Sequence, residues 1–313
     1  MSNTPQQTSS PAMADASTET ALVAELPFAP ACCHPEAFAL MHAQMQPVPA
    51  TLAHAGRKRR LDGDEGLLAA AVAVAMHALP QTELSETDAE IAKITEAASW
   101  HVKSGSDQAK LAYLHQTLFD DYGFRGNGQD YYNPRNSYLP SVLKTRRGLP
   151  IMLSMIYKLV AGRMGLRSWG VGLPGHFVAG VDCHGPVLVD AFGGGRLLDR
   201  DDAMELVDET AGPEAEFDES MLRPVTHRHW VTRLIQNLLQ IHSTAGNYTD
   251  VAAMLEFELV LWPDQLHLQR DLGLVLARIG QPRPAAMWLG KYLQQRPDDP
   301  QRSDLEELLS VLK

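Results

Sequence analysis

The spacing of apolar residues predicts a series of helices in the middle of the chain. An Ala-rich apolar stretch covers residues 67–79, a second helical pattern runs from about residue 85 to residue 101, and a third begins after Ser106. Residues 150–164 predict a further helix that ends at Gly165. Because this helix has only a narrow non-apolar stripe, we expect it in the core.

After residue 165 the spacing of apolar residues changes from that of a helix to the every-second-residue alternation of a β-strand. Short runs rich in Val, Leu and aromatic residues alternate with Pro-Gly, His-Gly-Pro and Gly-Gly turn signals. This pattern predicts an antiparallel meander. The expected strands are residues 168–173, 176–183, 186–190 and 195–198.

The last part of the chain contains a helical repeat. After an acidic link over residues 207–220, Gly246 recurs as Gly280 and Pro263 recurs as Pro297, both at 34 residues. This is the tetratricopeptide period, in which paired helices stack on one another. Only about two such repeats fit in the tail.

The first part of the chain gives a weaker signal. Residues 1–22 have few large apolar side chains, and residues 23–62 show no clean period, although residues 38–45 could make a short helix. We therefore expect three parts. They are a largely disordered or irregular segment over residues 1–62, a core domain over 63–222 and helical repeats over 227–313.

Charge and composition narrow the classes of partner and location. A formal net charge of −11 argues against direct binding of nucleic acid, because phosphate contacts need clustered basic residues. The basic run at residues 57–60 is either a contact patch or a solvated segment. No stretch reaches the roughly 18 apolar residues of a membrane span. The chain starts without a secretory signal and its cysteines form no disulfide framework, so we expect a cytoplasmic protein with no membrane contact.

The sequence predicts no metal site and no cofactor. Cys32, Cys33 and His34 could be combined with His184 as zinc ligands. Adjacent cysteines fit a tetrahedral site poorly, however, and a second ligand pair is missing.

Five segments together form a recognisable set. They are Asn136-Ser137, Arg146-Arg147-Gly148-Leu149-Pro150, Arg163-Met164-Gly165-Leu166, Leu173-Pro174-Gly175-His176-Phe177 and Val189-Asp190-Ala191-Phe192-Gly193-Gly194. The set resembles the transglutaminase-like core, and more narrowly the SirB-one-like family, in which that core is joined to tetratricopeptide repeats. The resemblance implies an α+β fold: a transglutaminase-like (papain-like) core with N-terminal helices and an antiparallel sheet, followed by an all-α tetratricopeptide-like unit.

The resemblance also implies a catalytic triad whose first member is absent here. Active relatives carry a cysteine at the start of the core helix, where the helix dipole lowers the thiol pKa, a histidine that takes its proton and an aspartate that orients the histidine. Aligned on Gly165, the nucleophile position is Pro150, while His176 and Asp190 take the other two places. Proline has no nucleophilic side chain but suits the first turn of a helix.

Neither of two other residues is a good substitute nucleophile. Cys183 lies an odd number of positions after His176 on the same expected strand, so its side chain should face the other way. Ser154 faces the same way as Pro150 but sits one helical turn away, roughly 5.4 Å along the axis.

His176 and Asp190 are expected to lie close together. A turn within residues 182–185 would pair their strands and bring the two side chains within hydrogen-bond reach. The pair is then either a structural contact that joins sheet and helix or a proton or anion site.

Four more residues match family positions near the cleft and are candidate ligand contacts, together with Ser154. We interpret Asn136 and Ser137 as loop capping, and Arg146 and Arg147 as surface charge or ligand clamps.

Two functions are consistent with these features. The first is a non-catalytic interaction or regulatory protein whose cleft binds a peptide or small ligand and whose repeats bind a protein partner. The resemblance adds that the family is described as regulators of expression. The second is a hydrolase or acyltransferase that uses His176 and Asp190 with a water molecule or Ser154.

Overall fold

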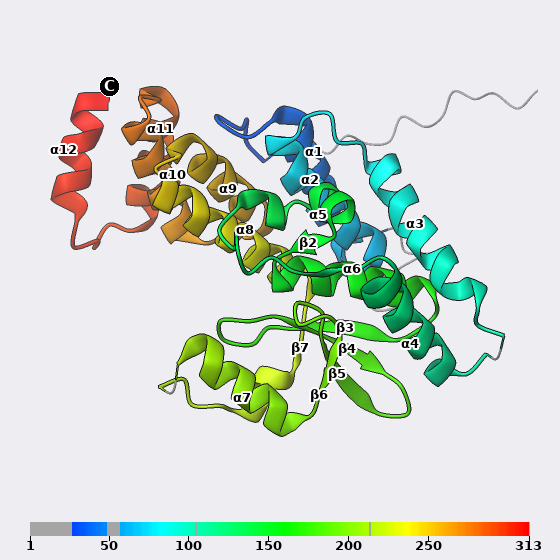
Figure 1. The fold of residues 1–313 in the computed structure, drawn as a ribbon. Coiled ribbons are helices and arrows are strands. Elements are labelled where there is room, and N and C mark those ends of the chain that lie inside the picture. The colour runs from blue at the N-terminus through cyan, green and yellow to red at the C-terminus, as the bar shows by residue number, and fades with distance from the viewer. Residues whose placement is uncertain (1–26, 49–56, 104, 213, 313) are drawn as a thin grey trace, which may run out of the picture.

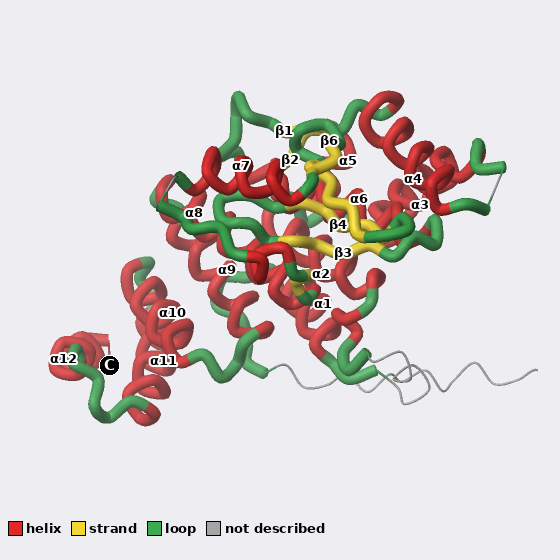
Figure 2. The backbone as a smooth tube through the Cα atoms, turned by 90° about the horizontal axis from the view of Figure 1, so that it is seen from below, coloured by secondary structure: helices red, strands yellow, loops and turns green. Residues whose placement is uncertain are grey.

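The computed structural model describes residues 27–48, 57–103, 105–212 and 214–312 (Figure 1). It consists of N-terminal helices, a mixed core with an antiparallel sheet, and a row of helices that leads away from the core to the C-terminus. Figures 1 and 2 both show α12 as the element farthest from the sheet. The α+β class with an all-helical tail is thereby confirmed.

The N-terminal helices surround the core helix. They are α1 (Pro35–Met45), α2 (Asp64–Ala78), α3 (Leu84–Trp100) and α4 (Asp107–His115), with the short turns η2 (Arg60–Asp62) and η3 (Gln116–Asp121). All side chains from residue 66 to residue 75 of α2 are buried, as its Ala-rich apolar sequence predicts. The three helices expected here are confirmed.

Helix α6 (Pro150–Arg163) is the centre of the molecule. Every residue from 150 to 161 is buried, and Gly165 ends the helix with a left-handed φ of +78°. The segment before it has short elements of its own. It contains η4 (Pro134–Ser137), α5 (Leu139–Thr145) and a two-residue parallel pairing of β1 (Arg125–Gly126) with β2 (Arg147–Gly148).

The sheet lies between α6 and α7 (Arg200–Ala211), as Figure 1 shows. Val181 and Val189 belong to the hydrophobic cluster around α6, whereas Val178 and Leu188 belong to the cluster beside α7. The alternation of apolar residues along the strands therefore corresponds to the two buried faces of the sheet. The strand order is β6-β5-β4-β3-β7 and all pairings are antiparallel, which confirms the meander. The strands are β3 (Ser168–Val171), β4 (Val178–Asp182), β5 (Pro186–Asp190), β6 (Arg196–Leu198) and β7 (Pro224–Val225).

Helix α7 differs from the link expected over residues 207–220. It reaches residue 211, and Asp199 starts it by accepting a hydrogen bond from the Asp202 amide in a capping box. The helix buries Ala203 and Val207, while its other face is strongly acidic. The acidic face explains why composition alone predicted a link.

The C-terminal helices follow the 34-residue repeat. Gly246 and Gly280 each end a helix at φ +74°, a conformation that other residues adopt with strain. The short turn η5 (Glu219–Leu222) precedes the helices. They are α8 (His227–Ala245), α9 (Tyr248–Leu261), α10 (Leu266–Arg278), α11 (Pro282–Gln295) and α12 (Arg302–Leu312).

Helix α8 belongs to both parts of the molecule, so the boundary expected near residue 227 does not divide the core. Trp230 is fully buried, its Nε1 donates a hydrogen bond to the Ile151 carbonyl at 3.2 Å, and its ring lies 4.7 Å from that of Phe177. Side chains of α8 and α9 continue the main hydrophobic cluster, while a second cluster begins on the other side of α9.

The N-terminal segment is more ordered than expected where it is described. Residues 1–26 and 49–56 lie outside the described part, but α1 packs on α2 and α9. The buried carboxylate of Glu256 on α9 accepts hydrogen bonds from the amides of Ala31 at 2.5 Å and Cys33 at 2.7 Å. Burial raises the pKa of Glu256 despite these hydrogen bonds. Sequence periodicity could not find this contact because its two sides are more than 200 residues apart.

No helix among the described residues has the length and apolar character needed to cross a membrane.

Replacing Trp230 with Ala is expected to lower the free energy of unfolding by about 3–5 kcal/mol, because it empties a fully buried site. Urea unfolding followed by circular dichroism measures the loss. Trp100→Ala is the control, since Trp100 is 78% exposed and should change stability by less than about 0.5 kcal/mol. Equal effects of both substitutions would contradict the placement of α8 in the core.

Candidate functional site

His176 and Asp190 form a buried pair at the ends of neighbouring strands. The β4–β5 hairpin pairs Ala179 with Val189, which puts residue 178 opposite residue 190 and places His176 two positions further along on the same face. His176 Nε2 lies 2.9 Å from Asp190 Oδ1. The other ring nitrogen of His176, Nδ1, has no hydrogen-bond partner among the described residues. The pair is therefore joined on one side and open on the other.

Asp190 is held in its charged form. Burial alone would raise the pKa of Asp190, but hydrogen bonds from His176 and from the amides of Gly193 and Phe192 outweigh it and lower the pKa. The amide of Phe192 is 3.1 Å from Oδ1. The turn after β5 therefore stabilises the carboxylate that orients His176.

The loop that carries His176 is fixed from two sides. Arg233 on α8 donates hydrogen bonds to the carbonyls of Leu173 and His176, the latter at 2.7 Å. Thr210 at the end of α7 donates to the Pro174 carbonyl at 3.0 Å. Gly175 adopts φ +68°, and a Cβ there would lie 2.6 Å from the Thr210 carbonyl oxygen, so only glycine fits. Sheet, α7 and α8 together set the position of His176.

A cavity of about 760 Å³ opens beside the pair. Its wall combines apolar rings with a few polar groups, as in binding sites for small molecules and peptides. Phe192 stands edge-on to the His176 ring at 5.8 Å between centroids. The lining residues are Gly128, Tyr131, Tyr132, Leu149, Pro150, Ile151, Gly175, His176, Phe177, Asp190, Phe192, Leu206, Glu209, Thr210, Arg233, Asn237, Gln240 and Ile241.

Pro150 lies in the cavity wall at the first position of α6. Leu149 is extended, and the helix begins directly after it. The first backbone amides of a helix have no intrahelical partner and create a positive end. The structure thus places a helix N-terminus, His176 and Asp190 around one cavity, with only a carbon ring at position 150.

Ser154 does not reach the cavity. Its side chain is fully buried, and its Oγ donates a hydrogen bond to the Phe177 carbonyl at 3.2 Å. The hydroxyl joins α6 to the start of β4. This contact leaves it no access to a ligand in the cavity.

The cysteines lie elsewhere. Cys32 and Cys33 border α9, where burial, reinforced by Glu256, raises the pKa of the Cys32 thiol to about 11 and also raises that of Cys33. Cys183 follows β4 at the hairpin turn. A raised pKa keeps a thiol protonated and unreactive at neutral pH. In the described part of the chain, no three His, Cys, Asp or Glu side chains are grouped closely enough to hold a metal ion.

Asn136 and Ser137 do not line the cavity, but Asn136 holds a loop that does. The Asn136 amide donates hydrogen bonds to the carbonyls of Asp130 at 2.6 Å and Tyr131 at 3.2 Å. These contacts shape the loop whose tyrosines line the cavity. Ser137 is fully buried behind this loop and also does not line the cavity.

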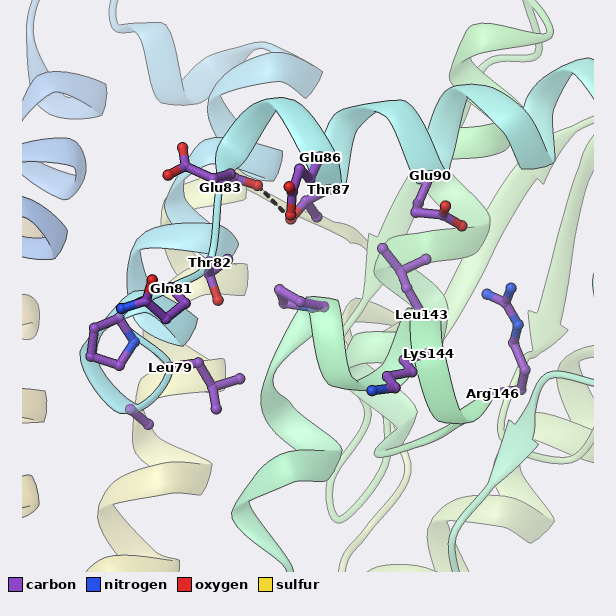
Figure 3. A pocket seen from close by; sticks show the side chains of 13 residues that line it. Leu79, Gln81, Thr82, Glu83, Glu86, Thr87, Glu90, Leu143, Lys144 and Arg146 are labelled. Atoms are coloured by element: carbon purple, nitrogen blue, oxygen red, sulfur yellow. Dashed lines mark hydrogen bonds between the residues drawn. The ribbon is translucent and has the colours of Figure 1, made fainter.

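Arg146 and Arg147 lie away from the pair. The guanidinium of Arg147 donates to the Gly123 carbonyl at 2.8 Å and braces the β1–β2 segment. Arg146 lines a separate hollow between α3 and α5, shown in Figure 3, where Glu90 stands above Leu143. The Cζ atom of Arg146 lies 4.9 Å from the ring centroid of Tyr122 and 4.8 Å from that of Phe124.

Several residues of the cavity were not expected from the sequence. Arg233, Asn237 and Gln240 come from α8, which the sequence assigned to the tail, and Tyr131 and Tyr132 come from a loop expected only to turn. The one available signal was the spacing of the polar residues on α8, which recur at helical intervals. Nothing in the sequence indicated that this stripe faces His176.

Comparisons with known proteins agree with this architecture. Residues 85–236 match the transglutaminase-like superfamily, and residues 238–310 match a tetratricopeptide repeat model. A UPF0162 protein of Xylella fastidiosa is 36% identical over 192 residues, which cover 60% of this chain and 68% of the relative. The chain belongs to the UPF0162 family. A further UPF0162 protein, from Vibrio cholerae, is 21% identical over 74% of this chain and 87% of its own length.

The two family models confirm the transglutaminase-like core and the tetratricopeptide-repeat tail, and the names of these relatives do not carry the SirB-one-like label. The mouse F-box only protein 21 is 29% identical over half of this chain and 26% of its own length. No solved structure matches the chain. Within the UPF0162 family, this chain therefore combines a transglutaminase-like core with repeats that commonly mediate protein interactions.

Asp190→Asn is expected to lower the free energy of unfolding by about 1–3 kcal/mol at pH 7, because it removes a buried charge-assisted hydrogen bond. The folded state holds the pKa of Asp190 below its ordinary value of 3.8. Its stabilisation is therefore complete above 3.8 and is lost as the pH falls through the lower, folded-state pKa. Urea unfolding from pH 7 to pH 3 should show the difference between the two proteins shrinking at the acid end.

Asp208→Asn is the control for this series, since Asp208 is exposed on α7. It should follow the parent protein at every pH. A difference between parent and Asp190→Asn that stays constant down to pH 3 would contradict the role of the Asp190 charge.

Proposed function

We propose that this chain is a non-catalytic binding protein whose transglutaminase-like cavity holds a peptide or small ligand and whose helical repeats hold a protein partner. The observation that carries the proposal is Pro150. It lies at the helix N-terminus where the resemblance expects a nucleophile, in the wall shared with His176 and Asp190. A cavity that keeps its shape and polar pair but has no nucleophile can bind without reacting.

The surroundings of Pro150 support this assignment. The Ser154 hydroxyl donates a hydrogen bond to a backbone carbonyl, and burial raises the pKa of the Cys32 and Cys33 thiols, whose backbone amides bind Glu256 of α9. Each residue that could replace the cysteine is therefore occupied or distant. The rigid loop of His176, fixed by Arg233 and Thr210, suits a preorganised binding site equally well.

The tail supports a role in protein interaction. Tetratricopeptide repeats present stacked helix pairs to a partner segment, and regulation of expression by such a protein would be indirect. The three cysteines are free thiols, which supports a reducing compartment such as the cytoplasm.

A hydrolase or acyltransferase is the second candidate, favoured by the geometry of the pair. The unpartnered Nδ1 of His176 and the charged Asp190 would let His176 take a proton from a water molecule in the cavity. Ser154 no longer supports this candidate because its hydroxyl is turned away from the cavity.

Turnover separates the two functions. We expect the full-length protein and its His176→Ala variant to leave chromogenic peptide amides and esters unchanged. His267→Ala is the matched control, because His267 is exposed on α10. Turnover that is present in the parent and in His267→Ala but absent from His176→Ala would overturn the non-catalytic assignment.

Pro150→Cys tests whether position 150 is the nucleophile position. A thiol there would lie at the positive end of α6 beside His176, so its pKa should fall. We expect iodoacetamide to alkylate it at pH 7 about tenfold faster than it alkylates the native thiols, as measured by mass spectrometry. Adding His176→Ala should remove most of this advantage. The same rate with and without His176 would show that position 150 does not face the pair.

A further inference from the structure

Arg233 is a cation in the cavity wall without an acidic partner. It belongs to α8, and burial lowers its pKa while its guanidinium lies over the Phe177 ring at 5.5 Å. Among the described residues, no carboxylate lies within ion-pair distance of it. A half-buried charge of this kind is costly unless a ligand or water pairs with it.

The guanidinium has hydrogen-bond donors to spare. Its Nη2 serves the carbonyls of Leu173 and His176, which leaves Nε and Nη1 without an acceptor in the described part of the chain. These nitrogens are not sealed in the interior as unsatisfied atoms. The guanidinium of Arg233 packs closely against Gly172, because a Cβ at that position would lie only 2.7 Å from Nη1.

The other titratable groups of the cavity do not compensate this charge. Asp190 is occupied by His176 and by backbone amides. Glu209 lines the cavity from α7 but is exposed, so solvent screens it. Tyr131 is neutral, since burial raises its pKa. Arg233 is therefore the basic side chain of this lining, and it keeps hydrogen-bond donors that an anion could accept from.

A polar stripe on α8 leads away from Arg233. Asn237 and Gln240 follow it at helical spacing and line the same cavity, and their side-chain amides have no partner among the described residues. A second cavity of about 570 Å³ shares Tyr132, Gln240 and Ile241 with the first and continues to Asn247. The two cavities are thus neighbours along α8, and the surface that they line together is called the α8 groove below.

We propose that this groove binds an extended peptide that bears a carboxylate, with the carboxylate paired to Arg233 and the peptide backbone hydrogen-bonded to Asn237 and Gln240. The inference rests on the proposed binding function and names its ligand class. The twelve residues of α8 after Arg233 rise roughly 18 Å. This length matches about five residues of extended chain.

The remaining donors explain why the cation is an arginine. With Nη2 held by two carbonyls, Nε or Nη1 can still donate a charge-assisted hydrogen bond to a carboxylate, and amide side chains pair with a peptide backbone through one donor and one acceptor. The carboxylate comes from a chain terminus or from an Asp or Glu side chain. Both sources present the same group to Arg233.

The test uses the full-length protein and three pools of random hexapeptides. One pool has a free C-terminus and no Asp or Glu, the second is the same pool amidated, and the third is amidated but contains one Asp or Glu. Bound peptides are identified by mass spectrometry, and the affinities of individual peptides are measured by fluorescence anisotropy. We expect the parent to bind peptides with a carboxylate at least tenfold more tightly than their neutral counterparts.

Arg233→Gln completes a double-mutant cycle with the ligand. If Arg233 pairs with the carboxylate, the tenfold preference should disappear in the variant. If Arg233 has a purely structural role, Arg233→Gln should lower the affinity for neutral and carboxylate-bearing peptides alike and leave the ratio of the two affinities unchanged. That result would overturn the assignment. Asn237→Ala leaves the hydrogen bonds of Arg233 intact, so it should weaken both kinds of peptide severalfold while the preference remains.

The remaining outcomes separate this inference from the proposed function. Equal binding of neutral and carboxylate-bearing peptides by the parent would overturn the inference and leave peptide binding standing. Absence of binding from all three pools would overturn peptide binding and the inference together. A preference confined to the first or the third pool would support the inference and identify the source of the carboxylate.

Discussion

The complete burial of α6 is the constraint on which the rest of the structure depends. A helix that is apolar on nearly every side must be covered on every side, and here the sheet, α2, α3, α5 and α8 all contact it. Its first turn is the part that borders a cavity. The positive end of the helix and the ends of β4 and β5 therefore meet at one place, which is where this fold can support chemistry or binding.

The pair of His176 and Asp190 is costly to maintain unless it is used. A buried histidine and carboxylate need hydrogen bonds: the turn after β5 donates one to the carboxylate, while α7 and α8 donate to backbone carbonyls of the loop that carries His176. His176 lines the cavity, and its Nδ1 has no hydrogen-bond partner among the described residues, which a role in joining sheet and helix would not require. The proposed binding function uses this supported pair together with the carbon ring of Pro150.

The sequence predicted the helices and strands whose own hydrophobic pattern shows which of their faces is buried. The periodic stretches gave α2, α3, α6 and the meander, and the motif resemblance identified His176 and Asp190. The sequence allowed only a short helix at residues 38–45 in place of α1. It did not predict that residues before α1 bind Glu256 more than 200 residues away, or that α7 continues into the acidic stretch expected as a link. Local patterns record which face of an element is apolar, not which distant surface covers it. The polar half of the cavity was missed for the same reason, since Arg233 meets a carbonyl 57 residues earlier.

Helix α8 links the two parts of the molecule physically. Its apolar side carries Trp230 into the core beside α6, its polar side carries Arg233 into the cavity, and its end begins the repeat with Gly246. A partner that shifts α9 or α10 acts on a helix that also holds the His176 loop. Because packed interfaces move as rigid units more readily than they deform, such a shift would be transmitted to the cavity through the Arg233 hydrogen bonds. The proposed binding at the cavity and the proposed binding at the repeats would then be coupled, and by linkage the coupling would act equally in both directions.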